Sequence, residues 1–85
     1  MPYVISVLPL DGFRLDVTFD DGTRGIVCLA DQLFGPVFEP LREHAYFAQV
    51  FVDEFGAIAW PNGADLAPDA LYDTLRAANG AVVNG

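Results

Sequence analysis

Residues 13–19 alternate strictly between apolar and polar side chains, and this alternation constrains the fold more than any other feature of the chain. The apolar positions are Phe13, Leu15, Val17 and Phe19, and the polar positions between them are Arg14, Asp16 and Thr18. A period of two predicts a strand with one buried face and one wet face. Asp20-Asp21-Gly22 follows, and its glycine permits the positive φ of a tight hairpin.

Segments typical of strands lie on both sides of this one. Residues 3–8 are apolar and β-branched, and Pro9-Leu10-Asp11-Gly12 after them is typical of a turn. Residues 23–29 form the return strand, in which Arg24, Ile26 and Cys28 share one face and Gly25, Val27 and Leu29 share the other. Residues 3–29 are therefore predicted to be a three-stranded antiparallel meander.

The rest of the chain predicts a middle helix, a second β-hairpin and a C-terminal helix, so the expected class is α+β. The middle helix is expected from about Pro40 to Phe47, and the hairpin over residues 49–60. The last helix is expected to begin between Asp65 and Pro68, with Asp65 as a cap for its free amides. Its stripe of Leu71, Leu75 and Ala78 should be buried.

The sequence Asn79-Gly80 is typical of a helix end. We therefore expect residues 1–79 to form a single α+β domain and residues 80–85 to form a short C-terminal tail.

The chain is 53% hydrophobic, which is rich for 85 residues because a small domain has much surface for its volume. One interpretation is a generous core with many alanines. The other is that apolar side chains remain exposed and form a surface for a partner. On the second interpretation, and because a short sheet has unprotected edges, we expect a two-fold homodimer.

Charge narrows the class of partner. The sequence has 12 acidic residues, 4 arginines and no lysine, for a net charge of −8. Nucleic-acid binding requires clustered basic side chains that neutralise phosphates, and the four arginines are far apart in sequence. We expect no direct nucleic-acid binding. The acidic surface fits either a basic protein partner or solubility alone, and a compositional bias would produce the same charge.

No residue pattern predicts catalysis, a cofactor or a metal. The single cysteine, Cys28, lies in an apolar run and is expected to be a small buried residue, and the single histidine, His44, is expected on a helix surface. The first ten residues lack a basic start, and the longest uncharged run of about ten residues is too short for a membrane span. We expect a cytoplasmic protein with no membrane partner.

Polar side chains gather most densely at the corner that runs from Trp60 into the last helix. Trp60, Asn62, Asp65 and Tyr72 are the candidate binding residues there. On a functional interpretation, an aromatic ring, an amide and a carboxylate recognise a peptide or a small polar ligand. On a structural interpretation, Trp60 and Tyr72 pack, Asn62 turns the chain and Asp65 caps the helix.

The chain resembles a bacterial family, domain of unknown function 2442, over about residues 3–76. The matching segments are Pro9-Leu10, Leu15-Asp16-Val17-Thr18-Phe19-Asp20-Asp21-Gly22, Pro36-Val37-Phe38-Glu39-Pro40-Leu41, Tyr46-Phe47-Ala48-Gln49-Val50, and Trp60-Pro61-Asn62-Gly63-Ala64-Asp65-Leu66 with Pro68 and Leu71-Tyr72 after it. The resemblance implies a small α+β fold with an antiparallel sheet and implies no established activity. It also implies longer relatives with a helix-turn-helix domain, and others encoded beside a small toxin-like protein.

Two hypotheses follow. The first is a protein-binding module, an antitoxin-like partner of a small basic protein, which accounts for the charge, the apolar content and the missing catalytic residues. The second is a small ligand-binding or enzymatic domain that uses the corner from Trp60 to Asp65. A basic protein encoded next to this one would favour the first hypothesis, and a bound metabolite would favour the second.

Overall fold

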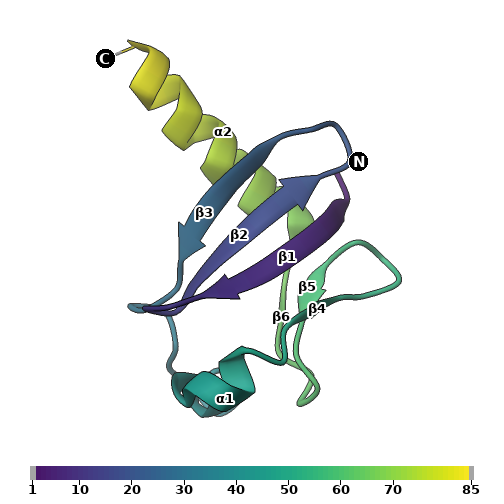
Figure 1. The fold of residues 1–85 in the computed structure, drawn as a ribbon, viewed down its shortest axis with the longest axis vertical. Coiled ribbons are helices and arrows are strands. Elements are labelled where there is room, and N and C mark those ends of the chain that lie inside the picture. Colours follow the sequence, from purple (N-terminus) through teal and green to yellow (C-terminus); the bar gives the residue numbers. More distant parts are fainter. Residues whose placement is uncertain (1, 85) are drawn as a thin grey trace.

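The computed structural model describes the backbone of residues 2–84 and the side chains of residues 2–77. In chain order the elements are β1 (Val4–Leu10), β2 (Arg14–Phe19), β3 (Arg24–Cys28), η1 (Glu39–Arg42), α1 (His44–Phe47), β4 (Phe51–Val52), β5 (Ile58–Ala59), β6 (Asp65–Leu66) and α2 (Pro68–Asn84). The described strands form two three-stranded antiparallel sheets, β1-β2-β3 and β4-β5-β6 (Figure 1). The predicted α+β class and the predicted meander are confirmed.

The first sheet has the two faces that the alternation predicts. Leu15, Val17 and Phe19 of β2 are fully buried, whereas Arg14 is exposed. The register places Leu15 opposite Val27, so the inner face continues onto β3. Cys28 is exposed, which corrects the expectation that it is buried, because it follows the alternation of β3 onto the outer face.

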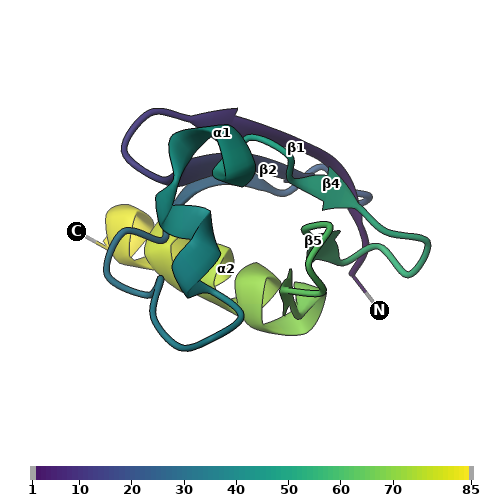
Figure 2. The same ribbon diagram turned by 90° about the horizontal axis from the view of Figure 1, so that it is seen from below.

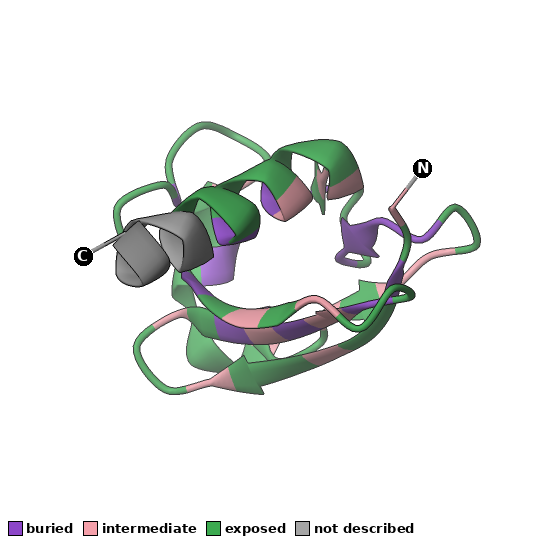
Figure 3. Cartoon of the chain, turned by 90° about the horizontal axis from the view of Figure 1, so that it is seen from above, coloured by how far each residue is buried: buried purple, intermediate pink, exposed green. Residues whose placement is uncertain are grey.

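Helix α2 covers the inner face of this sheet, and the outer face has no element over it in the described part of the chain (Figures 2 and 3). Leu71 and Leu75 are buried as predicted, and the side chain of Ala78 lies outside the described residues. The helix continues to Asn84, so the predicted end at Asn79-Gly80 is wrong. A glycine inside a helix costs only about 1 kcal/mol relative to alanine, which is too little to end a helix by itself.

The middle and the second half of the chain differ from expectation in two places. The predicted helix from Pro40 to Phe47 is divided into η1 and α1, because Glu43 between them has an extended backbone with φ −84° and ψ 123°. The second hairpin, β4 with β5, is confirmed. It gains a third strand, β6, which pairs Asp65 with Ala59. A strand of two residues is too short to show a period in the sequence.

The core lies between the first sheet, α2 and the second sheet. The largest fully buried side chains come from elements across the chain: Trp60, Phe19, Leu15, Leu33, Leu41, Ile58 and Val17. The two sheets are linked where the amide of Val4 donates to the carbonyl oxygen of Gly56 at 2.9 Å. This link places the β4–β5 turn beside the start of β1.

Candidate binding site

Trp60 is a core residue. Its side chain is 1% exposed, and its Nε1–H donates to the carbonyl oxygen of Phe47 at 3.0 Å. The two aromatic rings also pack against each other, with centroids 5.8 Å apart. Trp60 therefore connects the end of β5 to α1 through a hydrogen bond and a ring contact. Because the ring is buried, a solute outside the protein cannot contact it.

Asn62 holds the turn that follows Trp60. Its Oδ1 accepts from the amide of Ala64 at 3.0 Å, and its Nδ2 donates to the carbonyl oxygen of Val37 at 2.9 Å. Gly63 beside it has φ +93°, a conformation that glycine adopts without strain. The Asn62 amide thus connects this turn to the loop before η1, and both of its polar atoms have partners.

Asp65 does not cap the last helix, which corrects the sequence prediction. It lies in β6, three residues before the first residue of the helix, and it is exposed. The helix begins at Pro68, whose missing N–H is no loss in the first turn. Asp69 in that turn has the charge that the positive end of the helix dipole favours.

Tyr72 points away from the corner, toward the hairpin between β2 and β3. Its hydroxyl donates to Oδ2 of Asp21 at 2.5 Å, and its ring meets the Phe19 ring edge-on with centroids 5.1 Å apart. The guanidinium of Arg76 lies 5.7 Å from the centre of the Tyr72 ring. The hydrogen bond from Tyr72, followed by that from the Thr23 amide, lowers the pKa of Asp21 below its ordinary value.

The structure therefore brings Trp60 and Asn62 together in one turn, leaves Asp65 exposed on the next strand, and joins Tyr72 to a different hairpin. These contacts agree with the structural interpretation of Trp60, Asn62 and Tyr72. Binding of a ligand by the four residues stays a prediction.

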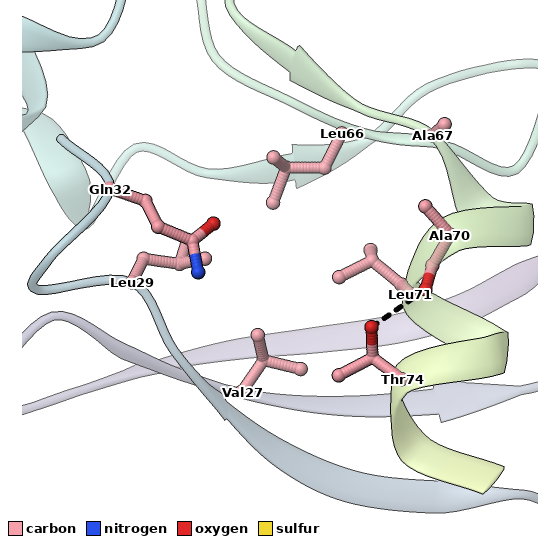
Figure 4. Close-up of a pocket in the computed structure, with 8 residues that line it drawn as sticks. All are labelled: Val27, Leu29, Gln32, Leu66, Ala67, Ala70, Leu71 and Thr74. Atoms are coloured by element: carbon pink, nitrogen blue, oxygen red, sulfur yellow. Dashed lines mark hydrogen bonds between the residues drawn. The ribbon is translucent and has the colours of Figure 1, made fainter. Parts of the chain in front are cut away.

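An apolar pocket that the sequence does not indicate lies between the end of β3, the start of α2 and β6 (Figure 4). Its volume is about 150 Å³. The apolar lining comes from Val27, Leu29, Leu66, Ala67, Ala70 and Leu71. Gln32 and Thr74 add polar groups, but the Thr74 hydroxyl donates to the carbonyl oxygen of Ala70 at 2.9 Å. No sequence pattern marks this pocket, since each apolar residue in it also suits a core.

The outer face of the first sheet is mixed in character. The register places Leu8, Asp16 and Ile26 in one row across the three strands. The carboxylate of Asp16 accepts from the guanidinium of Arg24 at 2.7 Å and 3.1 Å, and this bond lowers the pKa of Asp16. Leu8 and Ile26, which lie on either side of Asp16 in this row, are each 55% exposed.

The described residues contain neither a candidate metal site nor a helix able to span a membrane. Among them, no group of three or more His, Cys, Asp or Glu side chains is arranged to hold a metal ion. Of the helices described, none combines the length and the apolar character needed to cross a membrane.

Comparison with models of protein families identifies the family of the chain. Residues 4–77 match the family model described as "Protein of unknown function (DUF2442)". No curated protein and no solved structure matches the chain.

Proposed function

The chain belongs to the DUF2442 family, and we propose that it is a protein-binding module that docks on a basic, toxin-like protein. Toxin-like is the partner class that the resemblance implies, and basic is the class that the net charge of −8 favours. The proposal also includes a two-fold homodimer, no direct binding of nucleic acid, and a cytoplasmic location.

The observation that carries the proposal is the number of large apolar side chains on the surface of so small a domain. Among the side chains that the structure describes, eight are between 44% and 72% exposed: Tyr3, Ile5, Leu8, Ile26, Phe34, Val37, Phe51 and Phe55. Burial of apolar surface is worth about 25 cal/mol per Å², so a partner that covers several of these side chains gains affinity from them. Contiguous exposed apolar surface is typical of a protein-binding site, and two of these side chains, Leu8 and Ile26, lie in one row on the outer face of the first sheet.

Charge would act mainly on the rate of association. Arg24, one of the four arginines, forms an ion pair with Asp16. Its positive charge is therefore already used by one carboxylate and does not neutralise the others on the surface. A strongly negative surface attracts a basic protein from a distance and raises its association rate, while salt screens this attraction beyond about 8 Å at physiological ionic strength.

The proposal assigns no catalysis to the chain. The ring of His44 stacks on that of Phe13 with centroids 4.6 Å apart, and the Asp21 carboxylate is bonded to Tyr72 and Thr23. The one cysteine, Cys28, is exposed and free, which fits a reducing compartment.

Affinity purification of the tagged domain from its native host, with mass spectrometry of the co-purifying proteins, tests the proposal. We expect a basic protein to be returned. Its association rate with the purified domain should fall as salt rises, while its dissociation rate should change little. The variant Leu8→Ser should weaken binding, and Ala48→Ser, at an exposed position outside the eight exposed apolar side chains, is the control.

A gel-shift experiment checks the nucleic-acid part of the proposal. The purified domain should leave duplex DNA unshifted even at low salt, because it lacks the basic cluster that phosphates require. A retarded DNA band, or repeated purifications that return no protein, would contradict the proposed function.

A further inference from the structure

We propose that the groove between β3 and α2 binds an extended, apolar segment of a partner protein, which adds to the first sheet as a fourth strand beside β3. The inference rests on the proposed function, because it names the segment by which a basic partner would be held. Two independent features of the structure support it: the open edge of β3 and the pocket beside it.

The edge of β3 has backbone groups directed away from β2. The amide of Leu29 donates to the carbonyl oxygen of Phe13 at 2.9 Å, and the amide of Phe19 donates to the carbonyl oxygen of Thr23 at 2.8 Å. The pairs at the two ends of the β2–β3 ladder, Phe13 with Leu29 and Phe19 with Thr23, are therefore hydrogen-bonded pairs. Because such pairs alternate along an antiparallel ladder, the residues between them that face outward are Arg24, Ile26 and Cys28. In the described part of the chain no strand lies beyond β3.

The pocket opens where α2 and β3 separate. The two elements are in close contact at Gly25, where a Cβ atom would lie 2.6 Å from Cδ2 of Leu75. Toward Val27 on the strand and Ala70 on the helix they leave the pocket of about 150 Å³ (Figure 4). An apolar cavity of about 150 Å³ is large enough for a benzene molecule, so this pocket has room for one leucine, isoleucine or phenylalanine side chain.

An added strand would use both features at once. Its backbone would bond with the free groups of Arg24, Ile26 and Cys28, and its side chains would alternate between the two faces of the sheet. Side chains on the inner face would lie beside Val27 and enter the pocket. Side chains on the outer face would cover Ile26, which is 55% exposed without such a strand.

The charges around the groove favour basic residues beside the apolar ones. Asp31 follows the pocket residue Leu29, and Asp69 and Asp73 lie on the first turns of α2; all three carboxylates are exposed. Arg24 at the start of β3 is paired with Asp16. A second copy of this chain would bring another net charge of −8 to the same edge, which makes it a poorer occupant than a basic segment.

The test uses the whole chain and a synthetic probe. The probe is a blocked seven-residue peptide with apolar side chains at every second position, leucine at the centre and lysine at both ends. In ¹⁵N and methyl NMR spectra we expect it to shift the amides of Arg24, Ile26 and Cys28 and the methyl groups of Val27 and Leu71. It should also slow hydrogen exchange at those three amides.

Two variants separate the edge from the pocket. Ile26→Pro removes an outward N–H without removing a donor from the ladder with β2, and Ile26→Val keeps that N–H as the control. Ala70→Phe fills the pocket, and Ala45→Phe makes the same change at an exposed alanine of α1. Ile26→Pro and Ala70→Phe should each weaken binding about tenfold or more, as expected for loss of a backbone bond or of a buried aliphatic side chain.

Unchanged binding by Ala70→Phe, or peptide-induced shifts outside the groove, would overturn the proposal. So would shifts of the β3 amides on dilution without peptide, since they would identify a second copy as the occupant. If a native basic partner binds both groove variants as tightly as wild type, the groove assignment fails and the proposed function stands. If the peptide binds in the groove but no basic partner exists, the proposed function alone fails.

Discussion

The indole of Trp60 makes both a packing contact and a hydrogen bond with Phe47, so one side chain joins β5 to α1. Replacing a buried tryptophan with alanine costs about 3–5 kcal/mol. In a domain of this size each kcal/mol lowers the melting temperature by about 4–8 °C. We therefore expect Trp60→Ala to lower the melting temperature, measured by circular dichroism, by more than about 10 °C.

The control is Trp60→Phe, which keeps an aromatic ring in the core but loses the Nε1–H donor to Phe47 and part of the volume of the indole. Its melting temperature should lie between those of wild type and Trp60→Ala. A Trp60→Ala protein that melts like wild type would contradict the buried position of this side chain. It would instead favour the interpretation of the Trp60 corner as an exposed binding site.

The bond from Tyr72 to Asp21 predicts a dependence of stability on pH. The folded-state pKa of Asp21 is lowered, first by the Tyr72 hydroxyl and then by Thr23, whereas an unfolded aspartate titrates near about 3.9. The hydrogen bond therefore stabilises the fold fully at pH values above the unfolded-state pKa of aspartate. This stabilisation is lost as the pH falls through the folded-state pKa of Asp21. Tyr72→Phe should lower the melting temperature at pH 7, and this effect should shrink as the pH falls through the folded-state pKa of Asp21.

An NMR titration of the Asp21 carboxyl group checks the same prediction directly. In Tyr72→Phe the pKa of Asp21 should rise toward its ordinary value. Asp16 is the internal control, because its pKa is lowered by a separate bond from Arg24 and should not move. A pKa of Asp21 that is the same in both proteins would show that the hydroxyl does not hold this carboxylate in solution.

At the scale of the elements, the contact between α2 and β3 depends on the absence of a side chain at Gly25. A Cβ atom there would lie 2.6 Å from Cδ2 of Leu75, which is buried. Overfilling a packed core costs about 1–3 kcal/mol, so we expect Gly25→Ala to destabilise the protein in a denaturant titration.

A double-mutant cycle isolates that contact. Leu75→Ala removes the side chain that the new methyl group would meet, so Gly25→Ala should cost less in the Leu75→Ala background than in wild type. Residues in contact show coupling of about 0.5–3 kcal/mol. If the losses in unfolding free energy caused by Gly25→Ala and Leu75→Ala are additive, the side chain of Leu75 does not contact β3 closely at Gly25.

The helices and strands differ in how well they can be predicted from the sequence, because longer elements repeat their pattern of apolar residues more often. Seven alternating residues predict β2 and its buried face, because each added residue repeats the pattern. The two residues of β6 repeat nothing, so Asp65 resembles a helix cap when only local order is known. The pocket is harder still, since Val27, Leu66 and Ala70 come from distant segments and only the packing of α2 on β3 brings them together.

At the scale of the whole molecule, we expect self-association. The surface has large apolar side chains, among them Phe55 at 72% exposed, and sheet edges that pair with nothing in the described chain. Sedimentation at micromolar concentration should show a species of twice 9.2 kDa, and a clean 9.2 kDa monomer would contradict the dimer.

The response to salt concentration should distinguish the homodimer from the complex with a basic protein. Each copy has a net charge of −8, so salt should strengthen the homodimer by screening the repulsion between like charges. The complex with a basic protein should respond in the opposite direction. A homodimer that weakens with salt would show that specific ion pairs, and not apolar contacts, hold the two copies together.

The chain contains one tryptophan, and its burial against α1 makes it an intrinsic fluorophore for the folding reaction. Trp60 is not among the residues that line the pocket beside β3. Its emission should therefore change when the domain unfolds and stay constant when the groove is filled. The fluorescence of Trp60 then reports the folding of every variant without a label and without interference from groove binding. A substitution that merely unfolds the protein is thereby distinguished from one that leaves the fold intact and blocks a partner.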